Sequence, residues 1–390
     1  MLKEKITSLP LQLISVIIFV FLFGHLLSDN VVRFFYTFSY FFKEVLALFL
    51  PFMVFAFITC GILSFKRRAP IVLLVLLFFI VASNFCASII SFLTGRYFLA
   101  YIIKGVNSAS LIASKTITPL FDFSFPQLIA PDKVILASVL IGIVFSIFSV
   151  PVIDKTIKGF KSIVEIILNR YFIPFLPIYV LGFLLKMYHE GNILNLFGSY
   201  GKAFILVLLI QACYLFIIYF IGSGFDLKKC LKAIKVAIPS YLTAFSSMSS
   251  TATIPVTIKS ATKNTGDDKL PHMAVPILAN VHLAGDSVTV PIFALVTISI
   301  FMGASPDFFT FLNFVFYFCL TMLAVSGVPG GGIIVMIPIL KSILGFNPAM
   351  ISIITALYLL QDSFGTACNV MGDGALTIIV NKVLKKFRII

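Results

Sequence analysis

Long apolar runs, separated by short segments rich in Lys and Arg, constrain the fold of this chain more than any other feature. A helix of about 20 apolar residues is long enough to cross the hydrocarbon core of a bilayer. The chain has 390 residues, of which 60% are hydrophobic and only 11% charged, and its mean hydropathy is +1.11. Soluble domains carry far more charge, so the sequence predicts an all-α polytopic membrane protein.

The net charge of +14 suggests a nucleic-acid partner, but the distribution of the basic residues argues against one. Lys and Arg gather in the short connections between apolar runs, notably around Arg67, Lys158, Lys229 and Lys263. This excess is typical of the cytoplasmic loops of membrane proteins. We therefore expect no nucleic-acid partner, both termini in the cytoplasm, an even number of crossings, and insertion in the plasma membrane, which is the inner membrane of a bacterium.

Eight apolar runs are expected to cross the membrane as helices. The first has no small-residue cleavage site and is interpreted as a span rather than a signal peptide. Pro174 and Pro177 interrupt the fifth, and the segment from Arg96 to Lys133 is an external connection that we expect to form short surface helices. The six Cys residues form no C-x-x-C pair and are interpreted as small buried side chains. The eight runs are Leu11–Leu27, Val45–Phe65, Ile71–Leu93 (with Ser83 and Asn84 as a polar interruption), Val134–Ile153, Ile163–Leu185, Ala203–Ile221, Met273–Phe301 and Met350–Val380.

Two further apolar segments are broken in the middle. Ile234–Ile258 is polar from Ser246 to Pro255 and has Lys residues on both sides, which predicts a re-entrant hairpin that enters and leaves on the cytoplasmic face. An ordinary span whose serines pack against other helices is the alternative. Phe309–Leu344 contains Ser326–Gly332, where Gly and Pro prevent a continuous helix, and it predicts a second hairpin that opens from the external side. Interrupted segments in corresponding positions indicate the binding site of a transporter, where helix N-termini offer N–H groups to an anionic group.

The last apolar run carries four polar side chains on one helical face. Asp362, Thr366, Asn369 and Asp373 follow the spacing i, i+4, i+7, i+11. A carboxylate at membrane depth is costly unless it faces a cavity, an ion or a partner, so the stripe predicts a binding site. The alternative is a structural network in which Lys or Arg residues hold both carboxylates.

These motifs together resemble the dicarboxylate/amino acid:cation symporters, the family of glutamate-transporter homologues. Ser249–Pro255 resembles the serine-rich tip of the family's first hairpin, and Gly327–Gly332 resembles its second tip. Asn369–Asp373 resembles the signature of its eighth span, with Asp362 seven residues earlier. The resemblance is strongest from about residue 228 to the end of the chain.

The resemblance implies eight transmembrane helices plus two re-entrant helical hairpins, assembled as a homotrimer in which a transport domain slides through a scaffold like an elevator. Residues 1–68 would form scaffold spans one and two, and residues 69–100 the third span, in the transport domain. Residues 101–190 would form the external connection and scaffold spans four and five. Residues 191–390 would complete the transport domain with span six, hairpin one, span seven, hairpin two and span eight.

The resemblance also implies a transporter rather than an enzyme, without a cofactor, which imports an amino acid or a dicarboxylate together with sodium, protons or both. In this family the position of Asp362 holds the substrate's amino group. The implied substrate contacts are Ser249, Ser250, Thr251, Val328, Pro329, Gly330, Asp362, Gly365, Thr366 and Asn369. The implied cation-binding residues are Leu278, His282, Asn369 and Asp373, with one sodium at Asn369 and Asp373.

Three departures from the family pattern affect the expected coupling. The family's seventh-span motif Asn-Met-Asp-Gly-Thr is replaced here by His282–Asp286, so Ala284 stands where the family has a sodium-binding Asp. Two third-span ligands are replaced by Phe79 and Ala82, and one sodium site therefore looks dismantled. His282 and Asp286 are spaced i, i+4 and are candidates for a proton-carrying pair that makes transport depend on pH; a pair that only packs the span is the alternative.

A further departure affects specificity. The family's arginine that recognises a side-chain carboxylate falls at Gly365, which is expected to leave room for an uncharged side chain. We therefore favour a neutral amino acid over an acidic amino acid or a dicarboxylate, which remain the alternatives. An ion channel, a family member that has lost transport, and an intramembrane hydrolase are rival interpretations, although the sequence has no G-x-S-x-G motif.

Overall fold

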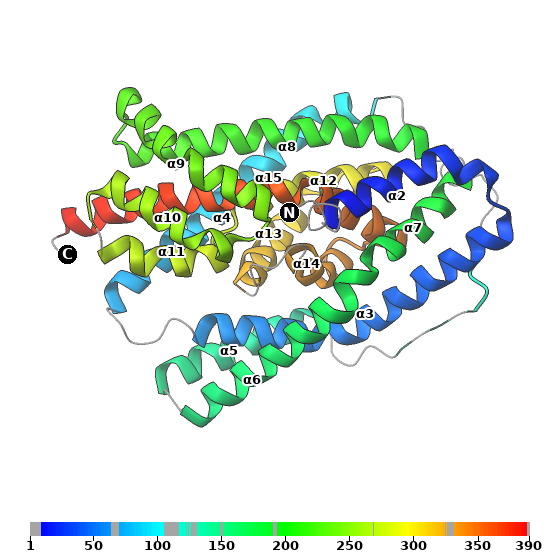
Figure 1. The fold of residues 1–390 in the computed structure, drawn as a ribbon, viewed down its shortest axis with the longest axis horizontal. Coiled ribbons are helices and arrows are strands. Elements are labelled where there is room, and N and C mark those ends of the chain that lie inside the picture. Colours follow the sequence, from blue (N-terminus) through cyan, green and yellow to red (C-terminus); the bar gives the residue numbers. More distant parts are fainter. Residues whose placement is uncertain are drawn as a thin grey trace.

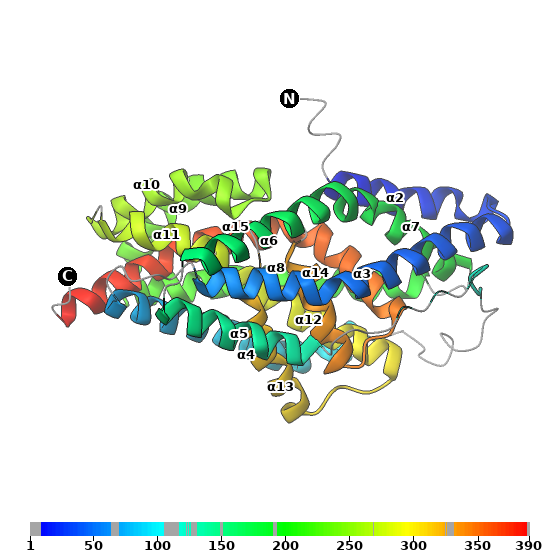
Figure 2. The same ribbon diagram turned by 90° about the horizontal axis from the view of Figure 1, so that it is seen from below.

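The computed structural model describes residues 9–63, 70–104, 117–121, 123, 125, 131–148, 151–189, 193–267, 269–323, 325 and 331–387. Within these ranges every regular element is a helix and no strand is present. Figures 1 and 2 show that most helices run along the long axis of an elongated molecule. The prediction of an all-helical chain is confirmed.

One group of helices comes from the first half of the chain and packs around α3. α3 contacts α5, α6 and α7, and α2 packs against α7. In Figure 2, α5 and α6 lie on opposite sides of α3. The aromatic rings of Tyr36 on α3 and Phe183 on α7 meet edge to face, 5.4 Å apart. The connection around Lys158, predicted as a loop, is helical. The group consists of α2 (Leu9–Phe23), α3 (Asp29–Leu63), α5 (Pro131–Phe148), α6 (Pro151–Ile167) and α7 (Ile173–His189).

The helix predicted to be interrupted at Pro174 and Pro177 changes geometry only before Pro174, and Pro177 lies inside α7. Leu168–Phe172 forms a π-helical turn between α6 and α7. A proline lacks the amide hydrogen of the helical ladder, and its ring clashes with the carbonyl four residues earlier. For Pro174 that carbonyl belongs to Arg170, inside the wider turn, so the turn relieves the clash.

Four helical stretches in the described part are long and apolar enough to cross a membrane. They run from Leu74 to Ile102, from Gly198 to Gly222, from Lys269 to Met302 and from Pro348 to Lys386. The third stretch consists of two helices rather than one, as described below. The elements concerned are α4 (Pro70–Ile102), α8 (Ile193–Gly222), α11 (Lys269–Val281), α12 (Ala284–Met302) and α15 (Pro348–Lys386).

The first predicted hairpin is present as two paired helices, α9 (Leu227–Ser247) and α10 (Ser250–Thr265). Met248 lies between them in the left-handed conformation, with φ of 51°, and its N–H bonds to the carbonyl of Ala244 at the end of α9. The Ser240 hydroxyl donates to the Ser260 hydroxyl over 3.0 Å and ties the two arms together. Both arms also contact α15.

The second interrupted segment forms α13 (Phe308–Met322) and α14 (Gly331–Ser342). Asp307 caps α13 by accepting the Phe309 and Thr310 N–H groups. The Thr310 hydroxyl, together with these backbone groups, holds the pKa of Asp307 below its usual value. At pH values above the ordinary pKa of an aspartate, this cap therefore stabilises α13 fully. The contribution is lost as the pH falls through the lowered pKa of Asp307.

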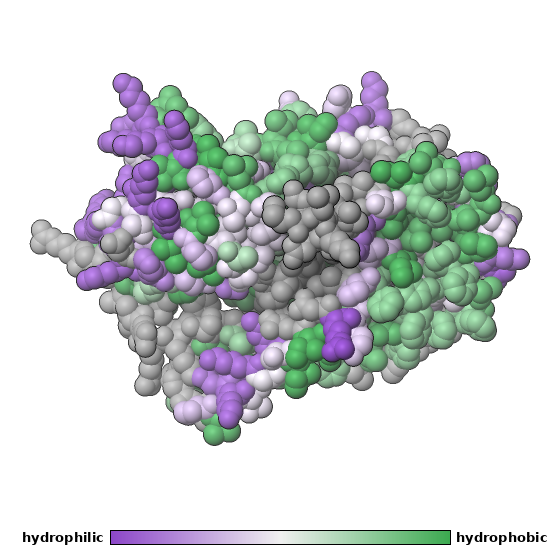
Figure 3. All heavy atoms as spheres, viewed as in Figure 1, coloured by the Kyte–Doolittle hydropathy of each residue, from purple (hydrophilic) through white to green (hydrophobic). Residues whose placement is uncertain are grey.

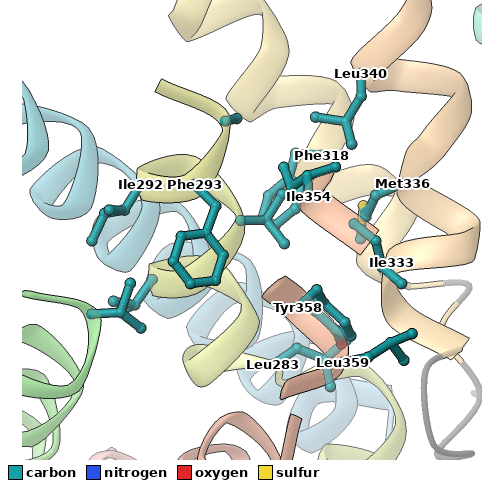
Figure 4. Packing of buried hydrophobic residues seen from close by; sticks show 14 of the residues in the cluster. Leu283, Ile292, Phe293, Phe318, Ile333, Met336, Leu340, Ile354, Tyr358 and Leu359 are labelled. Carbon is teal, nitrogen blue, oxygen red and sulfur yellow. The ribbon is translucent and has the colours of Figure 1, made fainter. Parts of the chain in front are cut away.

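The apolar core beneath the second hairpin joins α12 to α15. Figure 4 shows Phe293 of α12, Phe318 of α13, Met336 of α14 and Ile354 of α15 pointing toward one another. Each is at most 1% exposed. This core fixes α12 against α15, which is the contact on which the polar site is built.

The six Cys residues are free thiols, as predicted. Four of them are buried, but Cys86 and Cys213 are exposed. The prediction that all are small buried side chains is therefore wrong for these two, which lie on the outward faces of α4 and α8.

We expect Gly182→Ala to destabilise the packing of α3 against α7. A methyl group on Gly182 would overlap the Phe35 carbonyl and the Ser39 hydroxyl, and overpacking of this kind costs about 1–3 kcal/mol. Gly201→Ala is the matched control, because nothing lies within 4 Å of a methyl group there. The chain has no Trp, so thermal unfolding in detergent is followed by circular dichroism. Equal melting temperatures for the two variants would contradict the packing.

Candidate functional site

α15 carries the predicted polar stripe on one continuous helix. Asp362, Thr366, Asn369 and Asp373 are all buried, each at most 6% exposed. Thr366 Oγ1 donates to Asp362 Oδ1 over 3.3 Å, which is the contact expected of neighbours spaced i, i+4 on one helical face. The stripe therefore exists as a buried row of polar groups.

The seventh span is broken, although the sequence predicted one continuous helix. α11 ends at Val281 and α12 begins at Ala284, so His282 and Leu283 lie outside both. Asn84 of α4 bridges the break: its Nδ2 donates to the Val281 carbonyl over 3.0 Å, and its Oδ1 accepts from the Leu283 N–H over 3.1 Å. A helix end leaves backbone groups without partners, and this side chain supplies them.

His282 pairs with Asp373 and not with Asp286, which corrects the predicted pair. His282 Nδ1 lies 2.9 Å from Asp373 Oδ1, and Nε2 lies 2.8 Å from Ser83 Oγ. The i, i+4 argument assumed an unbroken helix, and the break turns His282 toward α15 instead. Since both ring nitrogens are engaged, the imidazole is held in place from two sides.

Asp286 lies in the first turn of α12 and is 3% exposed. Its Oδ1 accepts from the Tyr358 hydroxyl over 2.9 Å, and its Oδ2 accepts from Asn369 Nδ2 over 3.3 Å. Asn369 Oδ1 accepts from the Gly285 N–H over 2.7 Å. The amide of Asn369, implied to contact substrate and sodium, is therefore bound to α12 in this structure.

α12 and α15 cross at two glycines. A methyl group on Gly285 would overlap the backbone of Gly365, so the backbones can meet here only without side chains. A methyl group on Gly365 would stand 3.0 Å from Gln361 Oε1 and 3.4 Å from Asp286 Oδ1. The room expected beside Gly365 is therefore bordered by the side chains of Gln361 and Asp286, and its use by a substrate stays a prediction.

Three residues of this network were missed by sequence reasoning. Gln211 of α8 donates from Nε2 to the Gly285 carbonyl over 3.2 Å and to Thr289 Oγ1 over 3.1 Å. Thr289 in turn donates to Gln361 Oε1 over 2.9 Å. The available signal was Gln211 itself, which interrupts an otherwise apolar run and is 4% exposed.

The tip of the first hairpin lies beside the stripe. Phe245, near the end of α9, packs its ring edge to face against that of Phe364 on α15, with centroids 4.9 Å apart. Ser249 caps α10, and its hydroxyl accepts from the Ala252 N–H over 3.3 Å. Both arms of the hairpin contact α15, and a role of the α10 N-terminus in binding a substrate stays a prediction.

The remaining implied substrate contacts lie at the predicted tips of the two hairpins. Ser250 is buried and Thr251 is exposed at the hairpin tip. The implied contacts Val328, Pro329 and Gly330 lie outside the described residues.

One atom of the site fits a cation. Asp373 Oδ2 is buried and has no hydrogen-bond partner among the described residues. The Leu278 carbonyl, another implied cation ligand, already accepts the His282 N–H over 2.8 Å. In the described ranges no cluster of three or more His, Cys, Asp and Glu could hold a metal ion. Carboxylate oxygens are ligands that hard cations prefer, and this one is buried without a hydrogen-bond partner among the described residues.

The sequence profile of the sodium:dicarboxylate symporter family matches residues 9–383, which is nearly the whole chain. The chain belongs to this family. The family consists of transporters, and its long apolar helices make the chain an integral membrane protein. The resemblance predicted from the three motifs is confirmed.

The chain is similar to curated transporters, and each alignment covers only part of this chain and part of the relative. The serine/threonine transporter SstT of Acinetobacter baylyi is 29% identical over 161 residues, which cover 40% of this chain and 38% of the relative. That of Acinetobacter baumannii is 26% identical over 221 residues, or 54% and 53%. Excitatory amino acid transporter 3 of Oryctolagus cuniculus is 31% identical over 150 residues, or 37% and 28%. The matched part of the chain thus spans about half, or less, of each relative.

We expect Tyr358→Phe to destabilise the protein more than Tyr200→Phe. Both hydroxyls are buried, but Tyr358 donates to the Asp286 carboxylate, whereas Tyr200 bonds to the neutral hydroxyl of Thr297 over 3.0 Å. Hydrogen bonds to charged groups contribute about 1.5–3 kcal/mol, and neutral ones about 0.5–1.5 kcal/mol. The comparison is made by thermal unfolding in detergent, and a larger loss for the Tyr200 variant would argue against a charged Asp286.

Proposed function

We propose that this protein is a secondary active symporter that imports a small neutral amino acid together with sodium, protons or both. The observation that carries the proposal is the buried polar stripe of α15, which faces a broken helix and the tip of a hairpin. Broken helices at membrane depth persist where they line a cavity or hold a substrate or ion. The names of the relatives, which are serine/threonine and excitatory amino acid transporters, favour an amino acid.

The proposal includes the family architecture: eight crossings, two re-entrant hairpins, a homotrimer and an elevator motion in the bacterial inner membrane, with both termini cytoplasmic. The packing of α3 with α5, α6 and α7 suits a scaffold, and the packing of α15 with α8 to α12 suits a mobile unit. In this division residues 1–68 and 101–190 belong to the scaffold, and residues 69–100 and 191–390 to the transport domain.

Asp362 is assigned the amino group of the substrate, because its carboxylate lies on the buried stripe and a substrate ammonium would neutralise it. Thr366, one turn further along α15, and the N-terminus of α10 supply donors for the substrate carboxylate. An Asn369 amide released from Asp286 and Gly285 would add another donor on the same face.

The neighbourhood of Gly365 favours an uncharged substrate side chain. An acidic side chain placed here would lie near Asp286 Oδ1 and Gln361 Oε1, both of which are acceptors. His282 does not compensate, since its two nitrogens are engaged by Asp373 and Ser83. A buried carboxylate without a cationic partner costs several kcal/mol, so acidic substrates are disfavoured.

Uptake into proteoliposomes tests the function directly. We expect radiolabelled serine or alanine to accumulate against its gradient and to exchange with internal substrate, because a symporter alternates access whereas a channel does not. Unlabelled aspartate and succinate, at the same concentration, serve as matched competitors. A protein that takes up aspartate or succinate with micromolar affinity and ignores neutral amino acids would refute the substrate assignment.

Specificity should shift only when two positions change together. In Gly365→Arg, the new guanidinium would be neutralised by Asp286, so aspartate should compete no better than in the wild type. In Gly365→Arg combined with Asp286→Thr, the arginine is free, and aspartate competition should improve by about tenfold or more, equivalent to about 1.4 kcal/mol. Asp286→Thr alone is the control. An equal shift in the single and double variants would show that Asp286 does not face this pocket.

Two carboxylates of the stripe should separate cation binding from substrate binding. We expect Asp373→Asn to abolish the sodium-dependent rise in melting temperature, because it removes the unpaired anionic oxygen, while Asp362→Asn keeps the rise but loses the effect of substrate. A ligand present at 100 times its dissociation constant raises the free energy of unfolding by about 2.7 kcal/mol. If wild-type protein shows no sodium effect while uptake depends on pH, protons are the coupling ion and the sodium assignment to Asp373 is wrong.

A further inference from the structure

The two arms of the first hairpin border a groove of about 780 Å³. α9 and α10 are antiparallel, since Ser240 bonds to Ser260 and, nearer the open end of the hairpin, Asn264 Nδ2 donates to the Ala233 carbonyl over 3.1 Å. Figure 3 shows hydrophilic side chains gathered over this end of the molecule. The groove is lined by Lys232, Lys235, Val236, Pro239, Pro255, Val256, Lys259, Ser260 and Lys263.

The lining residues form one face of each helix. On α9 they are spaced i, i+3, i+4 and i+7, and on α10 they are spaced i, i+1, i+4, i+5 and i+8, which is the periodicity of a helical face. Each face contributes two lysines, so four ammonium groups border one groove.

These four lysines have no anionic partner in the described part of the chain. No carboxylate lines the groove, and none of the lysines forms an ion pair with a described residue. The described acids near the hairpin base are otherwise engaged: Asp226 pairs with Lys229, and Asp267 caps α11 through the Lys269 and Leu270 N–H groups. Like charges brought together repel one another, so the groove is suited to an anion.

Charge and apolar surface are separated along the length of the groove. In α9 the lysines precede Val236 and Pro239 on the way to the tip, and in α10 they follow Pro255 and Val256 on the way back. The lysines therefore lie at the open base of the hairpin, and the apolar residues lie nearer its tip. A soluble anion would use only the base, whereas a lipid would use both parts.

We propose that this groove binds an anionic membrane phospholipid, with its phosphate-bearing headgroup among the four lysines and an acyl chain along the apolar walls toward the tip. Basic pockets between helices at a cytoplasmic surface recognise anionic headgroups in this way. The proposal is independent of the transported substrate and requires only that the hairpin be inserted in the membrane.

Binding is tested with the full-length purified protein in detergent, by titrating phosphatidylglycerol and following the melting temperature. The groove variant replaces Lys232, Lys235, Lys259 and Lys263 by Gln. The control variant replaces Lys228, Lys269, Lys385 and Lys386 by Gln, which removes the same charge from exposed positions at the same end of the molecule. Phosphatidylcholine with identical chains and inorganic phosphate are the comparison ligands.

We expect phosphatidylglycerol to stabilise the wild type and the control variant, and the apparent dissociation constant to rise by about tenfold or more in the groove variant, because each lysine adds to the attraction of an anionic headgroup. Val236→Gln combined with Val256→Gln keeps all four lysines and should also weaken binding. Equal weakening in the control variant would overturn the proposal. So would stabilisation by inorganic phosphate alone, which would indicate a soluble anion, or by phosphatidylcholine to the same extent.

Discussion

The hydrogen bonds that join α15 to the broken pair α11 and α12 are the interaction on which the site depends. Asp373 holds His282 at the break, and Asn369 holds Gly285 and Asp286 at the start of α12. These groups are buried, and a buried polar group without a partner costs several kcal/mol at membrane depth. Hydrogen bonds, in addition to apolar packing, therefore fix the position of α15 relative to α11 and α12. The crossing at two glycines allows the backbones to come close enough for these bonds.

The same bonds explain how a rigid site could exchange partners. In the proposed binding mode, a substrate amino group would replace Thr366 as the donor to Asp362. A substrate carboxylate would replace Asp286 as the acceptor from Asn369. Asp373 differs, because one of its oxygens is already bound to His282 and the other is unpaired. A cation at that oxygen would complete the network, which gives a physical reason for ion binding and substrate binding to be linked through neighbouring turns of one helix.

In the proposed topology, the first hairpin connects α15 to the membrane surface. Its tip carries the Ser249 cap beside α15, and its base carries lysines that lack anionic partners in the described ranges. One element thus has a polar tip on the side of α15 and a cationic base at the predicted cytoplasmic face. A lipid held at the base would contact both arms at once, so the proposed lipid site and the proposed substrate site share a structural unit without sharing residues.

The sequence by itself determined the helical class, the family, the first hairpin and the polar stripe, because apolar run length, helical periodicity and local breakers such as Ser-rich and Gly/Pro-rich segments act over a few turns of one chain. It could not locate the break at His282 and Leu283, since the neighbouring polar residues Asn280 and Asp286 lie within helices. The side chain that bridges the break, Asn84, is 199 residues away from Leu283. For the same reason it paired His282 with Asp286, whereas the structure pairs His282 with Asp373. Which polar groups meet is decided by how helices cross, and the crossing of α12 and α15 at two glycines exists only in the tertiary structure.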